Sequence, residues 1–210
     1  MDNGVWYLRV TNQDGSPSRL LGIESSRMPD AAVETVTEAA FDDSMVAGWR
    51  CQVGFHNGQP ANITMAPDLV AKAPDLWFCE FHEDEATPPT AVHLIVFTGH
   101  NQPAGVLLDH AAVSNAGISY DTQLAAMRFY PATGELHQMY VQPAWRRYGI
   151  GRALIYATGA LSIAHGWPRI WAGGLRTEQG EQFRQSSPVW VTRSSDMTET
   201  APPMTPGEGS

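Results

Sequence analysis

The sequence predicts a mixed α/β domain in which helices flank a central sheet. Short apolar runs bounded by turn residues at 76–82, 91–97 and 134–141 are each typical of a strand. Residues 150–165 instead repeat apolar side chains at helical spacing, and His-Gly-Trp-Pro follows where such a helix should end. A chain of 210 residues with 43% hydrophobic content fits one domain with a core, expected at 1–193.

The first 90 residues are expected to hold mainly strands and one helix. A strand is predicted at 5–10, followed by a polar turn at 12–18. Residues 30–41 follow Pro29 and place valine and alanine at helical spacing, which predicts a helix. The other elements expected here are a strand at 49–55, a turn at Asn57–Gly58, a short helix at 67–73 and a strand at 76–82.

The second part of the chain shows clearer patterns. The apolar runs at 91–97 and 104–110 flank a polar turn and predict a hairpin, and residues 111–133 are expected to be a loop. Residues 194–210 are rich in Ser, Thr, Pro and Gly, so a disordered acidic tail is expected there. The remaining expected elements are a strand at 134–141, a helix at 150–165, a strand at 169–173, a helix at 177–185 with Thr177 as N-cap and a strand at 189–193.

Composition narrows the function. The net charge is −9, which argues against a general nucleic-acid binder, because phosphate neutralisation needs Lys and Arg. Two cysteines do not make a disulfide framework, and the N-terminus lacks the pattern of a signal peptide. No apolar run is long enough to span a bilayer. A cytoplasmic protein without a membrane partner is therefore expected.

The stretch YVQPAWRRYGIGRAL at 140–154 carries most of the functional signal. Pro143 should end the preceding strand, and a helix is expected to begin at about Ile150. The first N–H groups of a helix lack intrahelical partners and carry partial positive charge, so they suit a pyrophosphate. The residues expected around this opening are two glycines, Gly149 and Gly151, and three arginines, Arg146, Arg147 and Arg152.

Two common phosphate-binding motifs do not fit this stretch, because the glycine patterns of a P-loop and of a dinucleotide fingerprint are both lacking. Residues 134–155 instead resemble motif A of the GNAT superfamily of acyl-CoA-dependent N-acyltransferases. That motif is a strand, then Val-x-Pro, then Arg/Gln-x-x-Gly-x-Gly/Ala, then a helix. Here Val141 and Pro143 are followed by Arg146-x-x-Gly149-x-Gly151 in the right order and spacing.

The resemblance implies the GNAT fold, with a central mixed, mostly antiparallel sheet and splayed parallel strands around an acyl-CoA site. Residues 91–193 would form the cofactor-binding half and 1–90 a divergent acceptor-side half. Acetyl-CoA is the implied cofactor, with its pyrophosphate on the motif-A loop, its pantetheine arm along the end of the strand before it and its thioester in the splay beside Gly173–Gly174. The implied contact residues are Met139, Tyr140, Val141, Arg146, Arg147, Tyr148, Gly149, Ile150, Gly151 and Arg152.

The resemblance also suggests catalytic groups, because attack of an amine on a thioester needs a base and a donor for the oxyanion. Glu135 stands where many family members place a base, and His137 is a second candidate that could instead line the acceptor site or pack in the core. On the last helix the family's Asn, which contacts the cofactor, and its Tyr acid correspond here to Thr177 and Arg184. The resemblance implies that both bind the cofactor, with Arg184 stabilising the thiolate by its charge, but the usual acid is missing. The proton for the leaving thiolate would then come from Tyr120, Tyr130, Tyr156 or water. No metal site is expected.

The expected activity is transfer of an acetyl group from acetyl-CoA to a small-molecule or peptide amine. One alternative is a GNAT-fold protein that binds CoA or a partner without transfer, which the missing tyrosine motivates. Another is acylation of a nucleic-acid base, which the run Ala-Trp-Arg-Arg-Tyr at 144–148 suggests and the acidity of the chain opposes. No nucleic-acid partner is therefore expected, and a homodimer stays open.

Overall fold

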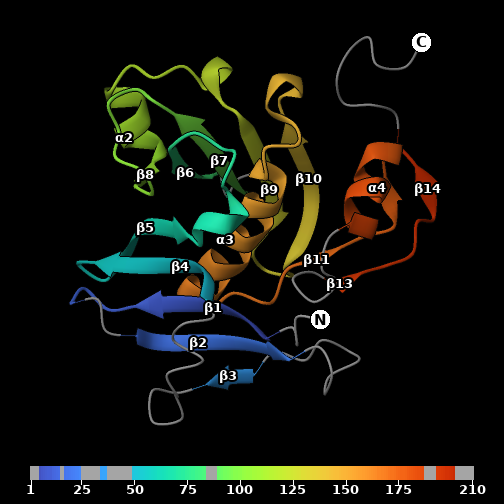
Figure 1. Ribbon diagram of the computed structural model, residues 1–210, viewed down its shortest axis with the longest axis horizontal. Helices are drawn as coiled ribbons and strands as arrows, with labels where there is room; N and C mark the ends of the chain where they lie inside the picture. The colour runs from blue at the N-terminus through green and yellow to red at the C-terminus, as the bar shows by residue number, and fades with distance from the viewer. Residues whose placement is uncertain are drawn as a thin grey trace.

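The computed structural model describes residues 5–14, 17–24, 34–36, 49–83, 89–186 and 193–201. Two sheets and the helix α3 (Ile150–His165) dominate this part of the chain (Figure 1). The helix contacts strands of both sheets, so it lies between them. The mixed α/β class predicted from the sequence is confirmed, and α3 has the predicted bounds.

The N-terminal sheet has the strand order β3-β2-β1-β4-β5. The β1–β4 pair is parallel and the other pairs are antiparallel. Its strands are β1 (Val5–Thr11), β2 (Pro17–Glu24), β3 (Glu34–Val36), β4 (Trp49–His56) and β5 (Gln59–Met65). The strands predicted at 5–10 and 49–55 are confirmed, and β2 and β5 are additions that the sequence pattern did not indicate.

The helix predicted at 30–41 is wrong where it can be compared. Residues 34–36 form strand β3, which pairs antiparallel with β2, and the rest of that segment lies outside the described residues. Sheet pairing therefore overrides the helical spacing of the valines here, and Thr35 and Val36 are β-branched residues that suit a strand.

The second sheet has the order β13-β11-β10-β9-β7-β6-β8 and holds the predicted strands near 76–82, 91–97, 134–141 and 169–173. A separate two-stranded ladder joins β12 to β14. The strands are β6 (Leu76–His82), β7 (Val92–Thr98), β8 (Leu107–Asp109), β9 (Ala125–Tyr130), β10 (Glu135–Val141), β11 (Trp171–Ala172), β12 (Leu175–Arg176), β13 (Arg193–Ser194) and β14 (Glu199–Thr200).

Short helices complete the fold. Helix α4 (Glu178–Ser186) matches the prediction at 177–185, and only a 3-10 turn, η2 (Pro67–Leu69), forms within the short helix expected at 67–73. The others are α2 (His110–Asn115), η3 (Tyr120–Thr122) and η4 (Pro143–Trp145). Among the described residues, no helix is both long and apolar enough to cross a membrane.

The predicted hairpin of 91–97 and 104–110 is wrong. Strand β8 pairs parallel with β6 at the edge of the sheet, whereas β7 pairs antiparallel with β6 and β9. The loop expected at 111–133 is also wrong, since it contains α2 and β9. The segment Ala125–Tyr130 alternates buried and half-buried residues as a strand should, but its two alanines and its arginine weaken the apolar signal.

Part of the segment expected to be a disordered tail forms a strand. Residues Glu199–Thr200 are β14, which pairs parallel with β12, and the Ala201 N–H donates to the Arg176 carbonyl at 2.8 Å. Residues 202–210, and residues 189–192 of the strand predicted at 189–193, lie outside the described residues.

Helix α3 is buried on almost all sides, which its small residues allow. Gly159 faces Leu8 of β1, and a Cβ at Gly159 would lie 3.2 Å from the Leu8 Cδ1. Two buried hydroxyls on the helix are satisfied within it: Thr158 donates to the Leu154 carbonyl at 2.9 Å, and Ser162 donates to the Thr158 carbonyl at 2.8 Å. The N-terminal sheet can therefore approach the helix closely without leaving unpaired polar groups.

Leu8→Ala is expected to lower the free energy of unfolding by about 2–5 kcal/mol, because Leu8 is buried against α3 and its loss leaves a cavity. Urea denaturation measures the change. Leu175→Ala is the matched control, since Leu175 is 62% exposed and its truncation should change stability by less than about 0.5 kcal/mol. Equal, small effects of both substitutions would show that the contact of β1 with α3 does not support the fold.

Candidate active site

A gap opens between strands β10 and β11, which are parallel neighbours over only two positions. Glu135 pairs with Trp171 and Leu136 pairs with Ala172. Beyond these pairs β10 continues to Val141. The segment that follows β11, residues 173–176, turns away from β10 and forms β12, which pairs with β14 instead. We call this segment the diverging arm. The divergence predicted at Gly173–Gly174 is thus confirmed, and its wide end lies toward the C-terminus of β10.

The closed end of this gap is fixed by the turn between β9 and β10. Gly134 has φ +77°, and a Cβ there would lie 2.2 Å from the Arg169 carbonyl oxygen, so only glycine fits. The Trp171 N–H donates to the Gly134 carbonyl at 2.9 Å, and the Trp171 indole donates to the Thr133 carbonyl at 3.0 Å. These contacts hold the start of β11 against the start of β10.

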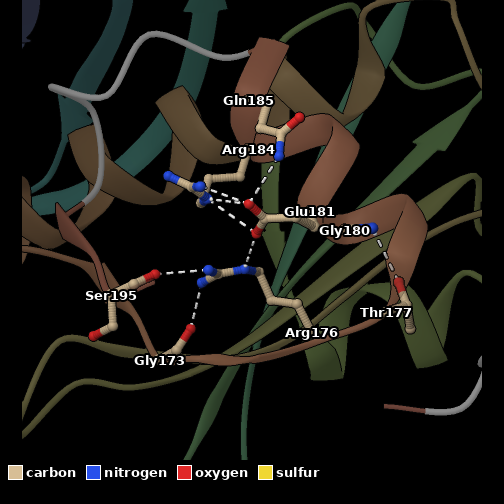
Figure 2. Close-up of polar contacts among 8 residues, drawn as sticks. All are labelled: Gly173, Arg176, Thr177, Gly180, Glu181, Arg184, Gln185 and Ser195. Carbon is tan, nitrogen blue, oxygen red and sulfur yellow. Dashed lines mark hydrogen bonds and ion pairs between the residues drawn. The ribbon is translucent and has the colours of Figure 1, made fainter. Parts of the chain in front are cut away.

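The diverging chain has its own support, which centres on Arg176 (Figure 2). The guanidinium of Arg176 donates to the Gly173 carbonyl at 2.5 Å and to the Ser195 carbonyl at 2.6 Å. Its Nε donates to the Glu181 carboxylate of α4 at 2.9 Å. The Thr198 N–H also donates to the Gly174 carbonyl at 3.0 Å. The arm is therefore held away from β10 by the C-terminal segment and by α4.

The start of α3, where the sequence predicts an anion site, lies at the wide end of the gap. Gly149 is the N-cap in the left-handed conformation, with φ +88°, and a Cβ there would lie 2.5 Å from the Leu69 carbonyl oxygen. No side chain caps the helix. Gly151 has an ordinary φ, and its nearest neighbours are the side chains of Phe183 and Val141. Gly149 is therefore required by the close approach of the Leu69 carbonyl, and the first N–H groups of the helix have no intrahelical partner.

The arginines of the loop divide into two groups. The Arg146 Nε donates to the Val141 carbonyl at 3.1 Å, so this side chain braces the end of β10. Arg147 and Arg152 are exposed. Arg147 also has φ +69°, a conformation that costs a non-glycine residue free energy and is often retained at functional sites. Tyr148 is exposed as well, with its ring 5.5 Å from that of Trp145.

The predicted catalytic pair lies at the closed end of the gap. The Glu135 carboxylate reaches toward the diverging arm, since a Cβ at Gly173 would lie 3.9 Å from its Oε1. The register of β10 against β9 shifts between Leu136 and Gln138, which puts His137 in a bulge without a paired residue on β9. A bulge frees backbone groups from the ladder, as an oxyanion donor requires.

The three tyrosines considered as proton donors to the leaving thiolate lie in different parts of the structure. Tyr156 is 1% exposed within the core, where burial raises the pKa of its hydroxyl. Tyr120 lies by η3, with its hydroxyl 2.6 Å from the His110 Nδ1. Tyr130 pairs directly with Glu135 across β9 and β10. Only Tyr130 of the three therefore lies beside the predicted base.

The two predicted site residues of the last helix have protein partners. The Thr177 hydroxyl accepts a hydrogen bond from the Gly180 N–H at 3.0 Å, which confirms it as a cap (Figure 2). The Arg184 guanidinium forms an ion pair with Glu181, with an N–O distance of 2.5 Å. The hydrogen bonds that the Glu181 carboxylate accepts from Arg184, the largest cause, and from Arg176 and Gln185 lower the pKa of Glu181 to about 2.

Sequence reasoning missed a network beside Tyr130. The Arg128 guanidinium donates to both carboxylate oxygens of Glu83, at 2.7 and 2.9 Å, and His93 lies 2.6 Å from the same carboxylate. The hydrogen bonds from Arg128 and His93 lower the pKa of Glu83 to about 2. The alternation of β9 places Arg128 and Tyr130 on one face, and this signal in the sequence could have found them.

Gly149→Ala is expected to lower the free energy of unfolding by about 2 kcal/mol or more, because alanine strains a left-handed φ and its Cβ meets the Leu69 carbonyl. Gly151→Ala is the control: its φ is ordinary and its Cβ meets side chains at 3.4 and 3.5 Å. Alanine there should leave stability unchanged or raise it. Urea denaturation of the free protein measures both. A Gly149→Ala variant as stable as the original would contradict the close approach to Leu69.

Comparisons with known proteins agree with this geometry. No curated protein and no solved structure is significantly similar to the chain. A family model does match, with the description Acetyltransferase (GNAT) family, over residues 67–179. The match includes β10, the motif-A loop, α3 and the divergent arm through β12. Because it spans more than half of the 210 residues, the chain belongs to the GNAT family of acetyltransferases.

Proposed function

We propose that this protein transfers an acetyl group from acetyl-CoA to an amine. The observation that carries the proposal is the start of α3 at the wide end of the β10–β11 gap, where Gly149 is the N-cap and no side chain caps the helix N–H groups. A pyrophosphate there and a thioester in the gap would belong to one extended ligand. Family membership supports acyl transfer in general, and acetyl-CoA as donor and an amine as acceptor are our inference.

The pyrophosphate end of acetyl-CoA would bind the backbone amides in the first turn of α3 and the exposed arginines beside it. Residues 146–152 would hold the pyrophosphate, with Arg147 and Arg152 supplying charge and Arg146 shaping the end of β10. The backbone of Met139, Tyr140 and Val141 borders the gap and would pair with the pantetheine arm as an added strand does. The thioester would then lie near the closed end.

The residues at the closed end suit the chemistry of acyl transfer. Glu135 would accept a proton from the attacking amine, directly or through water. A backbone N–H of the bulge at His137 would donate to the oxyanion of the tetrahedral state. His137 is exposed, so its side chain would face the acceptor rather than the core. The acceptor is a small-molecule or peptide amine.

A second candidate function is CoA binding without transfer. It is favoured by one observation: the position at which the family often has a tyrosine holds Arg184, which is bound to Glu181. Modification of nucleic acid has less support, because the net charge is −9 and Arg146 is turned toward the backbone of β10. Cofactor binding and turnover, measured separately, distinguish these functions.

Acetyl-CoA is expected to raise the melting temperature of the protein. When the protein is given acetyl-CoA and a panel of amines one at a time, it should release free CoA with at least one of them. The panel covers polyamines, aminoglycosides, free amino acids, peptide N-termini and aromatic amines. Release is measured by detecting the free thiol of CoA. A rise in melting temperature without CoA release from any amine would favour the binding protein. No rise with acetyl-CoA or CoA would contradict both functions.

Arg147→Gly is expected to weaken acetyl-CoA binding about tenfold without loss of stability. The variant removes a charge from the pyrophosphate site, and glycine accepts φ +69° without strain. Calorimetric titration measures affinity. Asn57→Gly is the matched control, because it also places glycine at a position with positive φ, +50° in the β4–β5 turn, and so removes the same kind of backbone strain. Equal affinities of both variants and the original protein would contradict a cofactor role for Arg147.

A further inference from the structure

Tyr130 stands at the closed end of the gap, beside both predicted catalytic residues. It is the last residue of β9 and pairs in register with Glu135, so the two side chains are neighbours on one face of the sheet. Its ring lies 5.5 Å from the ring of His137, which is in the bulge. Tyr130 is half-buried, which restricts its motion while leaving it accessible to a ligand.

Arg128 holds the hydroxyl of Tyr130 from one side. Its Nη1 donates to the Tyr130 oxygen at 2.8 Å, and its guanidinium carbon lies 4.9 Å from the centre of the tyrosine ring. Its Nε and Nη2 donate to the two oxygens of Glu83, which fixes the plane of the guanidinium. His93 contacts the same carboxylate at 2.6 Å. Arg128 is therefore anchored before it reaches Tyr130.

This arrangement decides where the tyrosine proton can go. A guanidinium has five donors and no acceptor, so Tyr130 cannot donate to Arg128 and can only accept from it. No described residue accepts a hydrogen bond from the Tyr130 hydroxyl. The O–H group thus remains available to a ligand at the closed end.

We propose that Tyr130 is the proton donor for the leaving thiolate and that Arg128, anchored by Glu83, is its positioning residue; this inference rests on the proposed function. The amine nitrogen bonds to the carbonyl carbon and gives one proton to Glu135. The carbon–sulfur bond breaks with its electron pair on sulfur, which takes the proton of Tyr130. Glu135 then returns its proton to the Tyr130 oxygen. The products are an amide and a free thiol, and the protein is unchanged.

The other candidates for this role are placed less well. Tyr156 is buried in the core, and the Tyr120 hydroxyl contacts His110, the first residue of α2, and the Cys79 sulfur of β6. Arg184 cannot release a proton at neutral pH and is bound to Glu181. Tyr130 alone among these groups combines an available proton with a place next to Glu135.

Kinetics with the most active amine of the panel test the role directly. Tyr130→Phe should lower kcat about 100-fold and leave the KM for both substrates nearly unchanged, because only the proton is lost. Tyr120→Phe is the matched control and should retain kcat. A higher amine KM with unchanged kcat would overturn the acid role in favour of acceptor binding, and unchanged kinetics would overturn the proposal altogether.

A binding measurement tests the contact with sulfur without turnover. Calorimetry compares the affinity for CoA with that for desulfo-CoA, which has hydrogen in place of the thiol. The original protein should bind CoA several-fold more tightly, and Tyr130→Phe should abolish this preference. A preference that survives the substitution would overturn the proposal. Because this readout needs no acceptor, it tests the contact of Tyr130 with sulfur separately from CoA release, whose absence with every amine would contradict the proposed function.

Arg128→Lys tests the positioning role. Lysine keeps a charge for Glu83 but cannot bind both of its oxygens and Tyr130 together. The substitution should lower kcat in the original protein and have almost no effect when Tyr130 is already phenylalanine, because Arg128 acts through that hydroxyl. Additive losses of kcat in the double variant would overturn the positioning role. Melting temperatures of all variants confirm that each is folded.

Discussion

The burial of α3 between two sheets is the constraint on which the candidate site depends. The proposed anion site is at the first turn of the helix, whose body is packed against β1 and β4 on one side and β9 and β10 on the other. Gly149 lies against the Leu69 carbonyl, so the start of the helix is placed by backbone rather than by flexible side chains. A helix with larger residues could not fit this space, because interiors are packed to high density.

The gap beside the helix depends on a second set of contacts. The two parallel strands are joined at their closed end by Gly134 and Trp171, while Arg176 and the segment 195–201 hold the diverging arm from outside. These contacts therefore keep β10 and the diverging arm apart without a bound ligand. Glu135, His137 and Tyr130 gather at the closed end because the β9–β10 turn and the bulge place them there. The proposed pyrophosphate site and the proposed reactive end are thus positioned by separate elements.

Motif A could be predicted because its signal is local. Proline, two glycines and a helix with a clear end all lie within 134–166, and each acts on its own stretch of backbone. The apolar run that holds β8 could be predicted, but its parallel pairing with β6 could not, and neither could strand β3, because pairing between separate segments outweighs local propensity. The partner of Arg128 was equally hidden, because its ion pair with Glu83 depends on which distant segments become neighbours. Arg184, in contrast, pairs with Glu181 three residues earlier on the same helix.

Amide hydrogen exchange with and without acetyl-CoA tests the central claim most directly, because it reports on the backbone groups said to bind the ligand. We expect slower exchange in peptides that cover 139–141 and 146–152 when acetyl-CoA is added, and no change in β4 or β5. Protection confined to other segments, or none at saturating ligand, would contradict the assignment of the α3 N-terminus and the β10–β11 gap as the acyl-CoA site.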